Sequence, residues 1–307
     1  MAALKIFLFG KFRMECDWLT PDSFRARKVQ ELFVYLLIFK ERPQARESLS
    51  GLLWGDVPPE KSKKNLRQTL WRLQNILKET SQPALLVDDQ WIQITIPEKC
   101  FLDTAEFERI FHSINKKHAR ELSTTDLQSM ENAVALYKGC LLDGWYQDWC
   151  IFERERFQTM HIMLLDKLIQ YCEVHHAFDS GLIYAAEILR HDRAYERTHR
   201  QMMRLHYMSG DRTQALHQYK RCTAALREDL DVEPSLRTKQ LYQQIRTDTF
   251  KPPLFAIVQH VPNSTENNPA IENVLDRLEQ FSDQLNQIKL EVQQEINALE
   301  EALLTRK

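Results

Sequence analysis

The chain has 307 residues, of which 43% are hydrophobic and 27% charged, and its formal net charge is −2. These values favour a soluble globular protein of two ordinary domains. Seven glycines are too few to suggest the glycine-rich phosphate cradles of nucleotide enzymes. The six cysteines are scattered, and no apolar run is long enough for a membrane span or a signal peptide. We therefore expect a cytoplasmic protein with reduced thiols and no membrane partner.

Residues 1–97 follow the element order of a winged helix-turn-helix domain. Apolar and polar side chains alternate over residues 1–22 around a turn at Gly10, which predicts an antiparallel hairpin. Three segments with helical periodicity come next, at residues 29–37, 47–54 and 61–78. Residues 85–94 then form two short predicted strands around a polar turn, which would be the wing.

The third helical segment is strongly amphipathic. Leu66, Leu70, Leu73 and Leu77 fall on one narrow arc, and we expect them to pack against the first two helices. The opposite face then carries cations and amides, the groups that contact phosphates and base edges in a major groove. From Ser23 to Lys78 there are six Lys and six Arg against five acids, a local charge of +7. A solvated charged face is the alternative interpretation.

The candidate DNA contacts lie on the outward faces of the first and third helices. They are Lys61, Lys64, Arg67, Gln68, Trp71, Arg72, Arg25 and Arg27. We assign Lys61, Lys64 and Arg72 to the phosphate backbone. Arg67, Gln68 and Trp71 project deeper and are assigned to bases. The wing tip is acidic at Asp88 and Asp89, which argues against a strong phosphate contact there.

Residues 98–247 read as one helix after another. Asp103-Thr104-Ala105-Glu106 and Thr125-Asp126-Leu127-Gln128 resemble capping boxes that begin two of the helices. Gly181-Leu182 is echoed by Ala215-Leu216 at a spacing of 34 residues, which is the tetratricopeptide period. The sequence therefore predicts a tetratricopeptide-like helical domain.

The C-terminal part of the chain predicts a linker and a coiled coil. Residues 248–270 are rich in proline and polar side chains. Residues 271–307 repeat apolar side chains at heptad spacing, which favours a helix that dimerises the chain. The seam residues are Ile271, Leu278, Phe281, Leu285, Ile288, Val292 and Leu299. A helix that lies back on its own helical domain is the alternative.

No catalytic motif is visible, so we predict that the chain is not an enzyme and uses no cofactor. Walker, G-x-G-x-x-G and G-x-S-x-G patterns are all absent. Glu187 and His191 lie four residues apart and close in sequence to His175-His176, but this spacing is common by chance and we expect no metal site.

An aromatic patch is the remaining feature of the helical domain. Its residues are Trp145, Tyr146, Trp149 and Phe152. Core packing where the two domains meet is the expected explanation for such a dense group. A groove for an unknown ligand or partner protein is the alternative.

Seven short motifs stand in order between residues 4 and 246. Three lie in the N-terminal domain, at 26–32 (ARKVQEL), 53–59 (LWGDVPP) and 65–73 (NLRQTLWRL). Four lie in the helical domain, at 133–139 (AVALYKG), 141–144 (LLDG), 210–216 (GDRTQAL) and 230–235 (LDVEPS). Together they resemble the antibiotic-regulatory-protein class of bacterial transcriptional activators, and the last four resemble its bacterial transcriptional activator domain.

The resemblance implies a mostly α-helical protein: an α+β winged helix of the response-regulator type, then a tetratricopeptide-like bundle. It also implies an activator that binds repeated promoter sites on double-stranded DNA as a homodimer and recruits RNA polymerase. Trp54, Asp56, Val57 and Glu60 match the loop that faces polymerase in such proteins. A protein-interaction scaffold, in which the helical repeats and the coiled coil bind a partner, is the alternative function.

Overall fold

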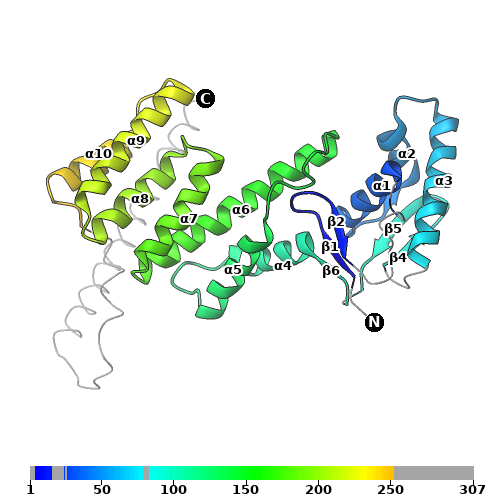
Figure 1. Cartoon of the computed structure of the whole chain (residues 1–307), viewed down its shortest axis with the longest axis horizontal. Coiled ribbons are helices and arrows are strands. Elements are labelled where there is room, and N and C mark those ends of the chain that lie inside the picture. Colours follow the sequence, from blue (N-terminus) through cyan, green and yellow to red (C-terminus); the bar gives the residue numbers. More distant parts are fainter. Residues whose placement is uncertain (1–3, 16–23, 25, 79–82, 98, 252–307) are drawn as a thin grey trace, which may run out of the picture. The chain divides into compact units, whose positions relative to one another are not determined.

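The computed structural model describes residues 4–15, 24, 26–78, 83–97 and 99–251 (Figure 1). By its internal contacts the chain divides into two units, Met1–Ala256 and Ile257–Lys307. The predicted coiled coil and most of the predicted linker lie outside the described residues. The elements below therefore belong to the first unit.

The N-terminal hairpin has the predicted form. β1 (Lys5–Phe7) pairs antiparallel with β2 (Arg13–Glu15), and Ile6 lies opposite Met14. Gly10, in the connecting turn, has a φ of +79°, a left-handed conformation that glycine adopts without steric cost. A third strand, β6 (Phe101–Leu102), pairs in parallel with β1. The alternating pattern does not predict this strand, because it is only two residues long.

The winged helix follows in the predicted order. Its elements are α1 (Arg27–Ile38), α2 (Arg46–Trp54), α3 (Pro59–Lys78), β4 (Ala84–Val87) and β5 (Trp91–Thr95). α3 begins earlier than its apolar pattern suggests, because Pro59 takes the first helical position, where a missing N–H has no cost. A short strand, β3 (Gln44–Ala45), completes the wing sheet in the order β3-β5-β4.

The apolar face of α1 lies at the centre of the winged-helix core. Leu32, Phe33 and Leu36 are buried there. They belong to one cluster with apolar residues from α2 and the wing, namely Leu49, Leu53, Ile92 and Ile94. Ile92 and Ile94 reach this cluster together because alternate residues of a strand face the same side.

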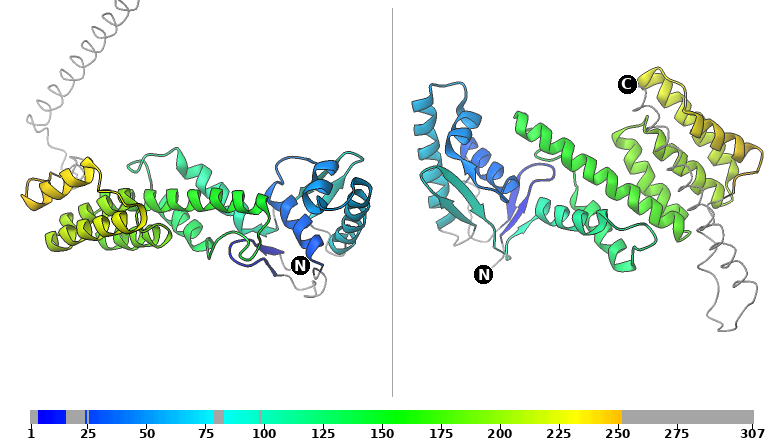
Figure 2. Two further views of the ribbon diagram at one scale, coloured as in Figure 1. Left: turned by 90° about the horizontal axis from the view of Figure 1, so that it is seen from above. Right: turned by 180° about the vertical axis from the view of Figure 1, so that it is seen from behind.

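Residues 103–246 are helical almost throughout, as predicted. Its helices are α4 (Asp103–Asn115), α5 (Thr124–Leu136), α6 (Asp148–Val174), α7 (Phe178–His191), α8 (Glu196–Met208), α9 (Arg212–Leu230) and α10 (Leu236–Arg246). From α6 to α10, consecutive helices pack side by side in alternating directions (Figure 2). Among the described residues, no helix combines the length and apolar character that a membrane crossing requires.

The 34-residue echo corresponds to two helical hairpins. α7 begins at Phe178 and α9 at Arg212, so their starts are separated by this period. The small residues Gly181 and Ala215 are both buried near those starts. A Cβ on Gly181 would lie 3.0 Å from Leu205 Cδ1 of α8. The small residue therefore lets α7 and α8 approach closely, as in tetratricopeptide packing.

The structure corrects both predicted capping boxes. Leu102 is the N-cap residue of α4 and provides no side-chain cap, while Asp103 uses its carboxylate elsewhere. α5 does have a capping box, but Ser123 and Asp126 form it instead of the residues from Thr125 onward. Residues 123–126 read Ser-Thr-Thr-Asp, so several capping registers fit the sequence, and only the backbone geometry separates them.

Asp103 ties the first strand to α4. Its carboxylate is 1% exposed and accepts hydrogen bonds from the backbone N–H groups of Leu8 (2.8 Å), Phe9 (2.9 Å) and Thr104 (2.7 Å). Burial raises the pKa of Asp103 to about 6, and the N–H donors act against this shift because they favour the ionised form. The carboxylate thus provides acceptors for the backbone N–H groups of Leu8 and Phe9, which directly follow β1.

The loop before α6 binds the other side of the same chain segment. The Gly10 N–H donates to the Cys140 carbonyl at 3.0 Å, and the Leu142 N–H donates to the Leu8 carbonyl at 2.8 Å. Apolar residues of both domains form one continuous core. The winged helix and the helical domain are therefore joined by backbone hydrogen bonds as well as by apolar packing.

Glu31 of α1 forms a second polar link between the domains. The carboxylate is 2% exposed, and Gln147, just before α6, donates to it through Nε2 at 2.9 Å. Lys28 Nζ lies 2.7 Å from the same carboxylate and Arg27 Nε 3.1 Å from it. These partners compensate a negative charge that would otherwise be costly to bury.

We expect Asp103→Ala to lower the free energy of unfolding by about 2–4 kcal/mol, because it leaves the buried N–H groups of Leu8 and Phe9 without acceptors. Urea denaturation followed by circular dichroism measures this loss. Asp143→Ala is the control, since Asp143 is exposed and its replacement should change stability by less than about 0.5 kcal/mol. Equal stability of the two variants would contradict the assignment.

Candidate nucleic-acid interface

α3 is anchored by its leucines. Leu66, Leu70, Leu73 and Leu77 are each at most 4% exposed and lie in the core that α1 and α2 share. The helical repeat aligns these residues in one stripe, as the sequence predicts. Burying a leucine side chain contributes on the order of 1.5–3 kcal/mol, so rotating the helix about its axis would forfeit several such contributions. The stripe therefore determines which side of α3 faces solvent.

The opposite face of α3 is exposed. All six α3 residues of the predicted contact set are on it: Lys61, Lys64, Arg67, Gln68, Trp71 and Arg72. Trp71 is 65% exposed, a large apolar surface surrounded by polar groups. Over its length α3 carries six cations against one acid, Glu60. A helix with this outward surface has the groups needed to contact an anionic, grooved partner.

One cation of α3 is already engaged inside the domain. Lys63 Nζ lies 3.1 Å from Glu47 Oε1, so this ion pair joins α3 to α2. The four cations of the predicted contact set on α3 form no ion pair with another residue that the structure describes. Their charge is therefore available to a partner, whereas that of Lys63 is partly neutralised.

Of the two contacts predicted at the start of α1, one is engaged in an ion pair and the other is not described. Arg27 is exposed, but its Nε is bound to Glu31. The remaining N–H groups of its guanidinium can still donate, because a guanidinium has five donors. Arg25 lies outside the described residues.

The wing tip is held against α2. The Arg46 N–H donates to the Gln90 carbonyl at 2.9 Å, and Arg46 Nη1 donates to the Asp88 carbonyl at 3.0 Å. A groove of about 440 Å³ lies between the wing tip, α2 and the start of α3, and it is lined by Arg46, Glu47, Glu60, Lys63, Leu66, Arg67 and Asp89. Because its lining combines three acids with three bases, this groove has less attraction for phosphate than the open face of α3.

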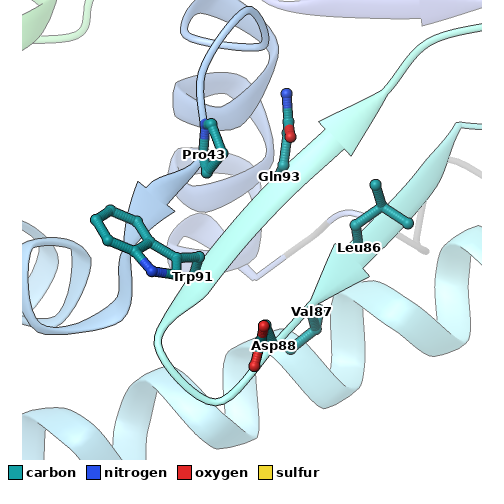
Figure 3. Close-up of a pocket in the computed structure, with 6 residues that line it drawn as sticks. All are labelled: Pro43, Leu86, Val87, Asp88, Trp91 and Gln93. Atoms are coloured by element: carbon teal, nitrogen blue, oxygen red, sulfur yellow. The ribbon is translucent and has the colours of Figure 1, made fainter.

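The outer face of the wing has a shallow apolar pocket that was not predicted from the sequence (Figure 3). Leu86 and Gln93 lie opposite each other in the β4–β5 register, and Trp91 shares their face. Pro43, Val87 and Asp88 complete a lining around about 560 Å³. The sequence feature that could have predicted this pocket is the position of Leu86 and Trp91, which stand where strand alternation would place polar residues.

The segment from the end of α2 to the first turn of α3 exposes only part of the set predicted to face polymerase. Asp56 and Glu60 are exposed, Val57 is half-buried and Trp54 is buried. Trp54 therefore anchors the loop and does not present a surface. A Cβ on Gly55 would lie 2.8 Å from the Gly51 carbonyl oxygen, so the close passage of the chain at this point requires a glycine.

The predicted aromatic patch divides into buried and exposed members. Trp149 is buried, with its ring 5.3 Å from that of Tyr35 in α1, and Trp145 packs beside it at 6.3 Å. These two residues pack where the domains meet. Tyr146 and Phe152 are 79% and 70% exposed and stay available to a partner.

Glu187 and His191 lie together, as their spacing on α7 requires. The residue that joins them is not from His175-His176, the pair close to them in sequence. His161 of α6 completes the group, with one potential ligand atom from each residue within 4.8 Å of the others. His175 and His176 are not part of it. The spacing along α7 indicated two of the three residues of this cluster, and the packing of α6 supplied the third.

Residues 102–246 match the family model of the bacterial transcriptional activator domain, from the end of β6 to the end of α10. The fold is similar to that of EmbR from Mycobacterium tuberculosis, solved in complex with a low affinity phosphopeptide, with a TM-score of 0.67 and 17% sequence identity over 82% of this chain and 67% of that chain. No curated protein sequence matches significantly. The resemblance to the antibiotic-regulatory-protein activators is confirmed, and these findings support a transcriptional regulator of that type.

Gly55→Ala tests the structural reason for the glycine before α3. We expect it to lower the free energy of unfolding by about 1–3 kcal/mol, because the new methyl group meets a backbone oxygen that cannot move aside freely. Gly51→Ala is the matched control, since open space surrounds that position in α2 and the change should stabilise the helix by roughly 0.5–1 kcal/mol. Thermal and urea unfolding measure both, and a stabilised Gly55→Ala variant would refute the explanation.

Proposed function

We propose that this chain is a cytoplasmic, sequence-specific DNA-binding transcriptional regulator that inserts α3 into the major groove. The exposed cationic and amide face of α3, opposite its buried leucine stripe, carries the proposal. A major groove about 12 Å wide accepts an α-helix about 10–12 Å in diameter. The match to the bacterial transcriptional activator domain adds independent support.

Position along α3 suggests different tasks for its side chains. Lys61 and Lys64 lie in the first turns, where the helix dipole adds to their attraction for phosphate. Arg67 and Gln68 have the hydrogen-bonding geometry for guanine and adenine edges, respectively. Trp71 offers an apolar surface to a thymine methyl group, and Arg72 extends toward the backbone.

The loop before α3 supports the finer proposal of an activator that recruits RNA polymerase. Asp56 in this loop and Glu60 in the first turn of α3 are exposed next to the proposed DNA contacts. A polymerase bound to the adjacent promoter would meet these carboxylates without displacing α3. Acidic side chains also keep the loop away from DNA phosphates, so that it remains free for a protein contact.

Dimerisation through residues 271–307 completes the proposal. Heptad spacing of apolar residues over this segment favours a two-stranded coiled coil. Two linked DNA-binding domains bind repeated half-sites with a higher effective affinity than either domain alone. The predicted linker of residues 248–270 would leave the half-site spacing to be determined by experiment.

The central test is binding to DNA duplexes that the wild-type protein selects from a random pool, measured by fluorescence anisotropy at several salt concentrations. We expect Arg67→Ala or Gln68→Ala to weaken binding to the selected site by about 10-fold or more and to relax specificity there. Lys64→Ala should weaken binding to every duplex and reduce the salt slope by about 1.

The charge control keeps the number of removed cations equal. The triple alanine variant of Lys64, Arg67 and Arg72 should lose site-specific binding. The triple alanine variant of Lys138, Lys220 and Arg237, which are exposed outside the winged helix, should retain it. If the first triple variant bound DNA as tightly as the wild type, the protein-interaction scaffold, with Tyr146 and Phe152 as contacts, would become the better explanation.

Removal of residues 263–307 tests the dimer. Sedimentation equilibrium should give two chains per particle for the full chain and one for the shortened chain, because the heptad seam is absent. Binding to tandem sites should weaken in the same variant, while binding to a single half-site should be preserved. A shortened chain that still contains two copies would show that another surface dimerises.

A further inference from the structure

His161, Glu187 and His191 bring two imidazoles and a carboxylate together on the helical domain, away from α3. His161 lies in α6 and the other two in α7, and potential ligand atoms from the three lie within 4.8 Å of one another. Metal ions with a preference for nitrogen and oxygen ligands are bound by such sets. DNA binding and this cluster therefore use different residues on different elements.

His161 is held in place before any ligand arrives. It is 2% exposed, and its ring stacks on Tyr137 with centroids 4.1 Å apart and an interplanar angle of 13°. Within the part of the chain that the structure describes, its Nδ1 is buried without a hydrogen-bond partner. Buried side-chain nitrogens normally have a partner, so this one calls for an explanation.

Glu187 and His191 face His161 from one side of α7. They are four residues apart, which places them one helical turn from each other. Glu187 pairs with Arg190, but Arg190 is 75% exposed, and an ion pair in solvent competes weakly with a bound cation. His191 is the last residue of α7 and is exposed, so an ion can enter from solvent and the side chain can adjust.

We propose that His161, Glu187 and His191 bind a divalent transition-metal ion, with zinc as the best fit. Two histidines and one glutamate are a ligand set that zinc uses when it keeps its fourth position open for water or a small ligand. Zinc bonds of about 2.0–2.2 Å place tetrahedral ligand atoms about 3.4 Å apart. The side chains of Glu187 and His191 would close by roughly an ångström or more around a fixed His161.

The bound ion would join α6 to the C-terminal end of α7. Because it binds the folded helical domain and not a separated pair of helices, it would raise the stability of this hairpin. It would also give the bacterial transcriptional activator domain a ligand to sense. The sequence favoured no metal site here, because His161 lies 26 residues before Glu187 and no local spacing connects them.

The test uses the full chain without an affinity tag, stripped of metal by a chelator and dialysed. Titration calorimetry with Zn²⁺ should give one ion per chain, and Co²⁺ should give the visible absorption of a four- or five-coordinate site. His191→Gln and Glu187→Gln should each weaken Zn²⁺ binding by about 100-fold or more, since loss of supporting groups outside the ligand set already costs about 10–100-fold. Zn²⁺ should raise the melting temperature of the wild type but not of these variants.

Two controls make the result decisive. His217→Gln removes an exposed histidine from α9 and should leave Zn²⁺ affinity unchanged. His161→Gln should abolish binding, and the exposed position of His191 keeps the test valid if that buried substitution disturbs folding. Zn²⁺ binding that survives in a Glu187→Gln/His191→Gln variant, or that disappears when the cysteines are alkylated in the wild type, would overturn the proposal, as would the absence of any binding.

Discussion

The burial of the α3 leucine stripe is the constraint on which the DNA-binding proposal depends. With Leu66, Leu70, Leu73 and Leu77 packed into the winged-helix core, the helix has one stable rotation about its axis. That rotation places Arg67, Gln68 and Trp71 in solvent together. The outward surface is thus a consequence of apolar packing on the opposite side.

The junction between the winged helix and the helical domain depends on buried carboxylates. The Asp103 carboxylate accepts hydrogen bonds from the N–H groups of Leu8 and Phe9, directly after the first strand. The Glu31 carboxylate accepts a hydrogen bond from Gln147 of the helical domain. Both groups are costly to bury, and both become favourable only when their donors are in position. A movement in the helical domain would therefore shift β1 and α1. α1 in turn packs directly against α3. This contact provides a physical route by which a ligand on the helical domain could influence α3, the proposed DNA-binding helix.

The proposed metal site lies on the helical domain, where a ligand would have to bind in order to influence α3 by this route. His161 shares the continuous core through its stacking on Tyr137, which itself packs against Phe9 of the N-terminal segment at 4.9 Å. An ion at this position would stiffen α6 and α7, and these helices stand next to that aromatic contact. The chain therefore contains one candidate input site and one candidate output surface, and the described packing connects them.

Local sequence patterns were sufficient for the elements that depend on neighbouring residues. Helical periodicity identified α1, α2 and α3, strand alternation identified both hairpins, and the 34-residue echo identified the paired helices that begin at Phe178 and Arg212. The side of α3 that faces solvent was also predictable, because hydrophobic burial follows directly from residue spacing. Each of these features depends on the spacing of residues along the chain.

Only the tertiary structure decided the features that join distant segments. The short strands β3 and β6 exist because longer strands offer them free edges, and Asp103 leaves its expected capping position because two unpaired N–H groups of the N-terminal segment lie within reach. The apolar outer face of the wing and the meeting of His161 with Glu187 and His191 have the same origin. The spacing of residues along the chain does not show which distant residues the packing will bring into contact. For these residues, the chemistry depends on that contact.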